Sequence, residues 1–228
     1  MISLPKLRRM AGIGSLMLLS LAAAATPGMC ENLLPNGDFE QGEFGWYIFA
    51  PQEVKDNCSY ARSSDEPQEG SHCGKLNSTV DARYAITNGP RNHVCKPGDR
   101  YRVSAWVRAG QDFATGAKTP GFCMRVSLYS QMEGYVDSKA GHFMLGLGNK
   151  AYFGKSINPL VPADPVPPTW TKLEGIFELP EDVQKVGVAI FSWNGQGTLY
   201  VDDVQLEIVD KSSTLTPLID SDEKKTDG

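Results

Sequence analysis

The sequence has no tract of clustered lysine and arginine, and its formal net charge is −5. Binding to the phosphates of nucleic acid requires such a cluster, so we expect no nucleic-acid partner. The catalytic motifs G-x-S-x-G and H-E-x-x-H and the phosphate-binding loop are absent as well. The three histidines, His72, His93 and His142, lie far apart and follow no metal-ligand spacing. These absences favour a protein that is not an enzyme.

Long apolar runs are also missing, apart from Ile13–Ala25 near the start. This run is too short for a membrane span, and the basic residues between Lys6 and Arg9 precede it. Small residues up to Ala25 suit cleavage, so residues 1–25 are predicted to be a signal peptide. We expect a secreted, periplasmic or cell-surface protein with no membrane span after cleavage. Lipidation at Cys30 is an alternative, although the three residues before it match a lipidation site poorly.

Five cysteines lie beyond this segment, and none of them has a C-x-x-C spacing. An oxidising compartment permits disulfides, and the odd number leaves at least one thiol unpaired within the chain. Cys58 with Cys73 and Cys95 with Cys123 are the candidate pairs. The sequence alone does not fix the connectivity.

No helical pattern follows the signal peptide, and no internal repeat is present. Instead, about eight short apolar segments are separated by turn residues, which is typical of an all-β sandwich or jelly roll. Residues 131–169 are rich in glycine and proline and predict a long loop. Residues 211–228 are polar and charged and predict a disordered tail. The expected strands are residues 46–49, 72–77, 82–86, 100–109, 122–129, 170–179, 186–193 and 198–208.

The last expected strand contains two adjacent carboxylates, Asp202 and Asp203. Neighbouring residues of a strand point to opposite faces, so one of the two must point inward. A buried carboxylate requires a hydrogen bond, an ion pair or a metal ion. Glu40 lies in a second acidic stretch near the other end of the domain. If the first and last strands are neighbours, Glu40 and Asp202 are candidate ligands of one calcium ion.

Four stretches, in this order, resemble carbohydrate-binding modules of the cenC type, the group of families 4, 9 and 22. They are NLLPNGDFEQGEFGW from Asn32, KPGDRYRVSAWVRAG from Lys96, WTKLEGIFELP from Trp170 and LYVDDVQLEIV from Leu199. The resemblance covers residues 32–210. It implies a two-sheet, galactose-binding-like jelly-roll β-sandwich, a structural calcium ion held by Glu40 and Asp202, and binding of a polysaccharide or oligosaccharide. The long segment 131–169 departs from the family pattern, as does the lack of an attached catalytic domain.

Sugar rings stack on aromatic side chains, so the tryptophans are candidate ligand contacts. Trp46 and Trp170 lie in the fold-defining stretches and are expected in the core. Trp106 shares a strand face with two arginines, and that mixture is compatible with a surface that faces a ligand. The candidate ligand-binding residues are Trp106, Trp193, Tyr129, Arg102, Arg108, Gln131 and Asn194.

We therefore expect a secreted, non-catalytic carbohydrate-binding module with a structural calcium ion. The alternative is a structural or adhesion module of the cell envelope that binds a protein partner through residues 131–169. Exposure of the aromatic candidates distinguishes the two, because a sugar platform requires open rings.

Overall fold

The computed structural model describes residues 31–89, 95–115, 121–155, 160 and 165–219. The expected signal peptide, Cys30 and His93 lie outside these residues, as does the end of the chain from residue 220. No helix in the described part is long and apolar enough to cross a membrane.

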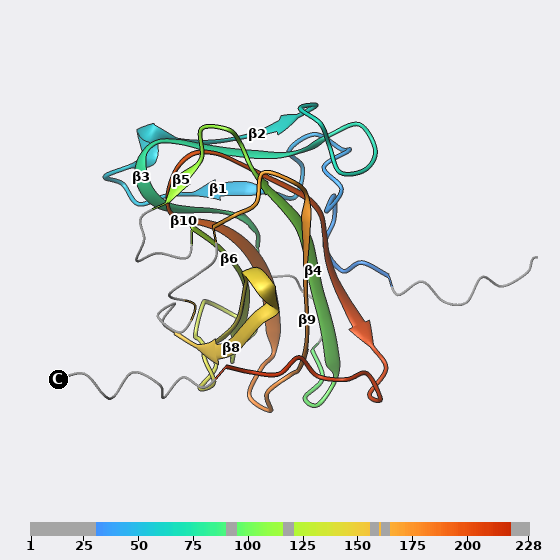
Figure 1. Cartoon of the computed structure of the whole chain (residues 1–228). Helices are drawn as coiled ribbons and strands as arrows, with labels where there is room; N and C mark the ends of the chain where they lie inside the picture. Colours follow the sequence, from blue (N-terminus) through green and yellow to red (C-terminus); the bar gives the residue numbers. More distant parts are fainter. Residues whose placement is uncertain (1–30, 90–94, 116–120, 156–159, 161–164, 220–228) are drawn as a thin grey trace, which may run out of the picture.

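The described chain consists of antiparallel strands with two short 3-10 turns (Figure 1). The all-β prediction is confirmed. The elements are β1 (Tyr47–Phe49), η1 (Lys55–Asn57), β2 (Cys58–Ser63), β3 (Cys73–Asn88), β4 (Arg100–Ala109), β5 (Ala114–Thr115), β6 (Gly121–Tyr129), β7 (His142–Gly146), η2 (Leu147–Asn149), β8 (Lys150–Gly154), β9 (Thr171–Glu178) and β10 (Lys185–Val209).

Two long strands, β3 and β10, belong to both layers of the sandwich. The first half of β10 pairs with the end of β3 and with β6, which forms a first sheet in the order β1-β3-β10-β6-β7-β8. The second half of β10 pairs with the start of β3 and with β4, which forms a second sheet in the order β2-β3-β10-β4-β9. The predicted jelly-roll sandwich thus has two sheets that are continuous through two bent strands.

The bend of β10 lies at Asn194–Gly197, whose sequence NGQG consists of turn-favouring residues between the expected strands 186–193 and 198–208. The register of β10 against β3 shifts between Trp193 and Gly195 and again between Gly195 and Gly197. Asn194 and Gly197 have positive φ angles of 52° and 92°, and such irregularities bend a strand without ending it. The expected strands 186–193 and 198–208 are therefore one strand, as are 72–77 and 82–86 within β3.

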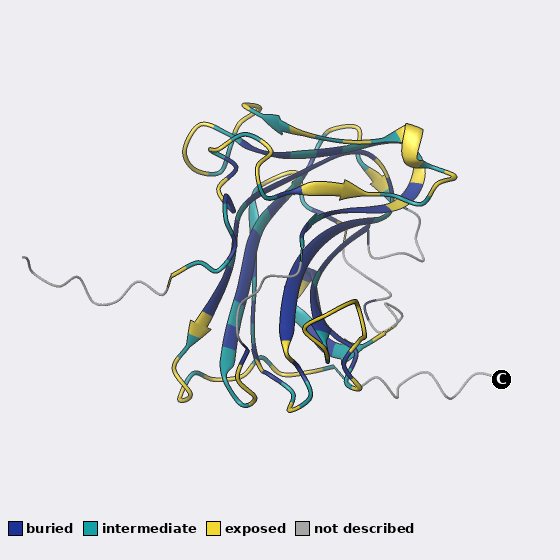
Figure 2. Cartoon of the chain, turned by 180° about the vertical axis from the view of Figure 1, so that it is seen from behind, coloured by how far each residue is buried: buried dark blue, intermediate teal, exposed yellow. Residues whose placement is uncertain are grey.

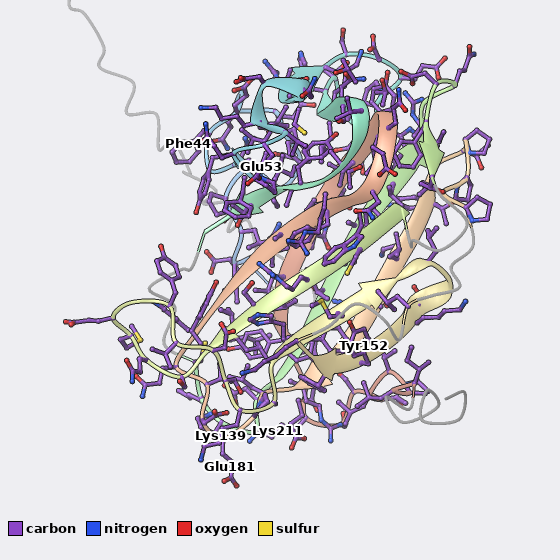
Figure 3. The ribbon with its side chains drawn as sticks, turned by 90° about the vertical axis from the view of Figure 1, so that its left-hand side faces the viewer. Phe44, Glu53, Lys139, Tyr152, Glu181 and Lys211 are labelled. Carbon is purple, nitrogen blue, oxygen red and sulfur yellow. The ribbon has the colours of Figure 1, made fainter. Side chains whose placement is uncertain are left out.

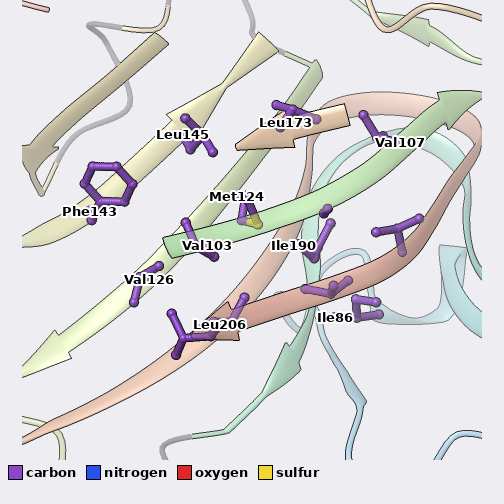
Figure 4. Close-up of a cluster of buried hydrophobic side chains, with 14 of the residues drawn as sticks. Ile86, Val103, Val107, Met124, Val126, Phe143, Leu145, Leu173, Ile190 and Leu206 are labelled. Carbon is purple, nitrogen blue, oxygen red and sulfur yellow. The ribbon is translucent and has the colours of Figure 1, made fainter. Parts of the chain in front are cut away.

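The main core fills the space between the two sheets (Figure 4). Val103, Val107 and Leu206 of the second sheet pack within the same cluster as Met124 and Ile190 of the first. Stacked aromatic rings close one side, with the centroids of Phe143 and Phe177 4.4 Å apart. This interior follows the alternation that the sequence predicts for β4, β6 and β9.

A second apolar cluster lies on the opposite face of the first sheet. It contains Ala85, Cys123, Met144, Tyr152, Leu160, Ala189 and Phe191. Residues 185–192 of β10 are consequently buried on both faces (Figure 2). Apolar residues at both alternating positions of the segment VGVAIF are the sequence signal for such a strand.

Two predicted irregular segments are more ordered than expected. The expected loop 131–169 contains the hairpin of β7 and β8, which extends the first sheet. The expected disordered tail is ordered over residues 211–219, where Thr216 exchanges hydrogen bonds with Ile176 of β9 and Ile219 donates to Ala151 of β8. Both errors have one cause, since the partner strands that order these segments are distant in sequence. The polar stretch 51–70, which reads as a loop, likewise contains β2.

No disulfide joins any two of the four described cysteines, Cys58, Cys73, Cys95 and Cys123, so the proposed disulfides are wrong. Cys58 lies opposite Ser78 and Cys73 opposite Ser63. The two thiols are thus separated by about 17 Å along the strand pair, at about 3.4 Å per residue, whereas a disulfide requires Cα atoms within about 7 Å. Cys95 and Cys123 are on different faces of the first sheet, because Cys95 packs in the main core and Cys123 in the second cluster.

Candidate functional site

Several aromatic side chains lie on the outer face of the first sheet. Tyr47 and Phe49 of β1 are 52% and 62% exposed. They lie opposite Thr87 and Ala85 of β3, so the four side chains share a face. Ala85 in turn lies opposite Phe191 of β10. This row continues the second apolar cluster towards solvent at the β1 edge.

A chain of stacked groups crosses this face from β3 to β6. The rings of Phe191 and Trp193 are 5.2 Å apart. The guanidinium of Arg83 lies 5.0 Å from the Trp193 ring, and that of Arg125 lies 4.8 Å from the Phe191 ring. Both distances are within the range of cation–π attraction. The four residues thus alternate as cation, ring, ring, cation along one surface.

Tyr129 marks the far end of the same face. It lies opposite Lys185, whereas Trp193 lies opposite Gly121 at the other end of the β6–β10 pair. The eight intervening steps along β6 span about 27 Å at about 3.4 Å per residue. The Lys185 ammonium lies 5.4 Å from the Tyr129 ring and donates to the carbonyls of Met132 and Gly134. The face is therefore long enough for a chain of several sugar rings.

The β7–β8 side of this face is closed. Leu160 and Ile219 pack with Met144 and Tyr152 there, in the second apolar cluster. Figure 3 looks onto this side of the molecule and marks Tyr152 on β8 and Phe44 near the β1 edge. The exposed aromatic rings of this face are accordingly those of the β1 edge, with half-buried Trp193 beside them, and Tyr135 at the far end, which is 71% exposed and lies 5.6 Å from the Tyr129 ring.

The predicted ligand contacts of β4 lie on the other side of the sandwich. Trp106, Arg102 and Arg108 are on the outer face of the second sheet, opposite the buried Val103 and Val107 as expected. Trp106 is paired with Asp202 and Lys172, within the second sheet. The structure therefore does not bring Trp106 together with Trp193 and Tyr129.

Both candidate arginines of β4, Arg102 and Arg108, are engaged within the protein. Arg102 forms an ion pair with Glu207 at 2.6 Å. The Arg108 guanidinium lies 4.0 Å from the Tyr200 ring and 5.2 Å from the Trp170 ring, and it donates to the carbonyl of Asp65. Trp170 is only half-buried and donates to Glu66, so its expected place in the core is wrong, whereas Trp46 is 4% exposed and confirmed as core.

The two polar candidates lie at opposite ends of the first sheet. Asn194 occupies the bend of β10 directly after Trp193, with φ of 52°. Gln131 is exposed just after the end of β6, near Tyr129. Of the seven candidates, Trp193, Asn194, Tyr129 and Gln131 are thus associated with the outer face of the first sheet.

Sequence reasoning missed five residues of this face: Tyr47, Phe49, Arg83, Arg125 and Phe191. Tyr47 and Phe49 were readable as same-face residues, because they are two positions apart in a short strand. Arg83 carried no signal, because β3 contains polar residues at many positions, whereas Arg125 is the only charged residue of β6 and was open to notice. Only the strand pairing shows that all five meet.

The two predicted metal ligands, Glu40 and Asp202, hold the same loop. Glu40 Oε1 accepts hydrogen bonds from the backbone N–H groups of Ser71 and His72, at 2.6 and 2.9 Å. Asp202 Oδ2 accepts from the N–H groups of Gln68 and Glu69, at 2.9 and 3.4 Å. The expectation that one of Asp202 and Asp203 points inward is wrong, because the bulge at Asp203 keeps Val201 and Val204 in the core. Asp202 lies opposite Trp106 on the outer face of the second sheet and is nevertheless 1% exposed, because the loop covers it.

Glu40 and Asp202 have different surroundings, and their pKa values are shifted in opposite directions. His72 Nδ1 lies 2.9 Å and Arg62 3.5 Å from Glu40 Oε2. The hydrogen bonds from Ser71 and His72 lower the pKa of Glu40 to about 2. Burial raises the pKa of Asp202 to about 6, although Asp203, Gln68 and Glu69 donate to it.

Calcium requires converging oxygen ligands, and the surroundings of Glu40 supply N–H donors and cations instead. Among the described residues, no group of three or more His, Cys, Asp or Glu side chains is placed to hold a metal ion. The site as it stands therefore does not fit the ion. Calcium binding stays a prediction, and it would require Glu40 to exchange its N–H partners for the ion.

The first residues of the described domain meet its last strand at a bulge of β10. Asp203 has φ of 46°, and the register of β10 against β4 shifts between Asp202 and Gln205. Val204 at this bulge donates to the carbonyl of Gly37, and the Asn32 amide donates to Val204. The sequence NGDFE thus docks its turn against the DDV stretch.

No family model and no curated protein matches the chain. Among solved structures, the enzymatically active domain of tailspike protein 4 from bacteriophage CBA120 superposes with a TM-score of 0.55 and 15% identity, covering 78% of this chain. This chain spans only 21% of that structure.

Carbohydrate-binding modules are also found. A xylan-binding domain from family 22 has a TM-score of 0.48 and 15% identity, over 78% of this chain and 94% of that one. A family 4 module has a TM-score of 0.48 and 12% identity, over 77% and 99%. At these identities and TM-scores, the likeness to these modules assigns no ligand to the chain.

Proposed function

We propose that the protein is a non-catalytic carbohydrate-binding protein that holds a polysaccharide or oligosaccharide on the outer face of the first sheet. The observation that carries this proposal is the set of aromatic rings on that face, from exposed Tyr47 and Phe49 to half-buried Trp193. The apolar C–H faces of sugar rings stack on such side chains. The resemblance of the four sequence stretches to carbohydrate-binding modules points the same way.

The rings occupy a rigid position, which favours binding. The Trp193 ring packs against the ring of Phe191, which is 5% exposed, and both residues belong to a strand that is hydrogen-bonded on both sides. A preformed platform loses little conformational entropy when a ligand binds. Polar groups at its two ends, Asn194 and Gln131, are available to sugar hydroxyls.

The test measures binding of soluble polysaccharides by affinity electrophoresis and calorimetry. Replacing Trp193 with alanine is expected to weaken binding about tenfold, which corresponds to about 1.4 kcal/mol for a buried aromatic contact. Trp106→Ala is the matched control, because Trp106 is also a half-buried tryptophan but faces the other side of the sandwich.

Loss of binding in Trp106→Ala with retention in Trp193→Ala would place the site on the second sheet and refute the assignment of the face. A folded protein that binds no glycan would refute the function itself. Melting temperatures of both variants separate loss of the platform from loss of the fold.

Export is part of the same proposal. Residues 1–25 carry the charge and apolar pattern of a signal peptide, so we infer that the protein works outside the cytoplasm. Expression of the whole chain in a bacterial host, followed by mass measurement of the periplasmic product, is expected to show cleavage near Ala25. An uncleaved cytoplasmic product would contradict it.

A further inference from the structure

The outer face of the first sheet carries two arginines whose hydrogen-bonding capacity is unused. Within the described part of the chain, neither Arg83 nor Arg125 donates a hydrogen bond or forms an ion pair (Figure 3 looks onto this face). By contrast, Arg62, Arg100, Arg102 and Arg108 all bind a carboxylate or a carbonyl. The two unpaired arginines are the ones that stack on Trp193 and Phe191.

Arg125 is the more informative of the two. It is half-buried, and its Nε atom is removed from solvent with no partner. Leaving a buried charged donor unsatisfied costs free energy, and this cost is recovered when an acceptor arrives. Burial and the nearby Arg83 both lower the pKa of the Arg125 guanidinium, which nevertheless stays protonated.

The remaining charges nearby do not neutralise the pair. Asp137 is within electrostatic reach of Arg125 but forms its contact with His142, at 3.7 Å. Lys185 is held by backbone carbonyls of the 132–134 segment. In a chain with 27 acidic and 22 basic residues, this face therefore presents unpaired positive charge beside aromatic rings.

We propose that the ligand is an acidic polysaccharide, whose uronic acid rings stack on Trp193 while their carboxylates bind Arg83 and Arg125. This inference rests on the proposed function and names the class of sugar. A guanidinium donates two parallel hydrogen bonds to a carboxylate, and such charge-assisted bonds are about twice as strong as neutral ones. A flat aromatic ring next to the guanidinium selects a carboxylate that is attached to a sugar ring.

The test compares polygalacturonate with its carboxyl-reduced neutral form, which keeps the same backbone. The purified chain is expected to bind the acidic polymer at least tenfold more tightly, and binding should weaken with added salt. Arg83→Gln and Arg125→Met are each expected to weaken binding of the acidic polymer about tenfold. Methionine keeps the apolar contact with Phe191. Lys172→Gln on the second sheet is the matched control and should change nothing.

The outcomes separate the two proposals. Equal binding of both polymers, lost in Trp193→Ala but not in the arginine variants, would overturn the acidic ligand and leave the sugar platform in place. Tighter binding of a sulfated polymer or of inorganic polyphosphate than of polygalacturonate would also overturn it, as a general attraction of anions. Binding of neither polymer nor any other glycan would overturn both proposals.

Discussion

The buried carboxylate Asp202 gives the clearest test of how the loop 68–72 is held. Its pKa is raised to about 6 by burial, above the 3.8 of an exposed aspartate. A raised pKa means that the folded protein binds the proton more tightly than the unfolded chain. Asp202 therefore adds stability as the pH falls from 7 towards 4, and its ionised form is unfavourable above pH 6.

The magnitude follows from the two pKa values. At pH 7 the carboxyl is ionised in both states, so the stabilisation from proton uptake is close to zero. At pH 5 it is mostly protonated in the folded protein and mostly ionised in the unfolded chain, which corresponds to about 1 kcal/mol. His142 opposes this trend, because burial lowers its pKa to about 4 and the folded protein resists its protonation. The pH dependence of the wild type alone is thus a mixture.

A difference measurement isolates Asp202. We expect Asp202→Asn to be less stable than the wild type at pH 7, because its amide NH₂ cannot accept the hydrogen bonds that Asp202 accepts. The stability gap between wild type and variant should widen by about 1 kcal/mol between pH 7 and pH 5, because only the wild type gains a proton there. Urea unfolding at several pH values measures the gap, and the contribution of His142 cancels.

A difference in unfolding free energy between wild type and Asp202→Asn that narrows from pH 7 to pH 5 would refute this reasoning. It would mean that the N–H donors, or a bound cation, keep the pKa of Asp202 below its ordinary value. Repeating the series with calcium and with a chelator distinguishes these two cases. Glu40 does not affect the measurement between pH 7 and pH 5. Its pKa is lowered to about 2, so the stability that it gives the folded protein is lost only below pH 4.5, where the unfolded chain begins to take up the proton.

Three further outcomes follow from the fold. Phe177→Ala removes a ring that stacks 4.4 Å from Phe143 in the core and should lower the free energy of unfolding by about 3–5 kcal/mol in urea; a loss below about 1 kcal/mol would contradict the packing. Gly37→Ala should destabilise the protein by about 2 kcal/mol, because the new Cβ would overlap the carbonyl oxygen of Val204, and an unchanged melting temperature would disprove the docking of the N-terminal turn. No disulfide joins the described cysteines to one another, so thiol titration after unfolding without reductant should detect Cys58, Cys73, Cys95 and Cys123, whereas a mass that requires reduction to reach the thiol value would show a disulfide.

The sequence was sufficient for strands whose two faces differ. β4, β6 and β9 alternate between core and outer positions, and their predicted bounds agree with the structure to within one or two residues. The sequence was insufficient to predict β7 and β8. Their segment contains several glycines, and it forms strands at the edge of the first sheet only because β7 pairs with β6. The sequence also failed at the bends of β3 and β10, where turn residues curve a strand instead of ending it.

The candidate site was only partly predictable for a related reason. Alternation tells which residues of one strand share a face, so Trp106 was correctly grouped with Arg102 and Arg108. Alternation does not tell which of the two sheets another strand belongs to, and so it does not tell whether residues of two strands share a surface. Trp193 was therefore assigned to the same ligand surface as Trp106, although β10 presents it on the first sheet and β4 presents Trp106 on the second.

β10 connects the candidate site to the loop 68–72. Its first half presents Phe191 and Trp193 on the outer face of the first sheet, and its second half holds the loop through Asp202. The bend at Asn194–Gly197 turns one continuous strand through both sheets, and the bulge at Asp203 lets both Val201 and Val204 remain in the core. Because the strand is hydrogen-bonded on both sides along most of its length, the position of Trp193 is set by the whole sandwich and not by a loop. A platform fixed in this way binds with little reorganisation, so substitutions on it should change affinity through lost contacts and leave the fold intact.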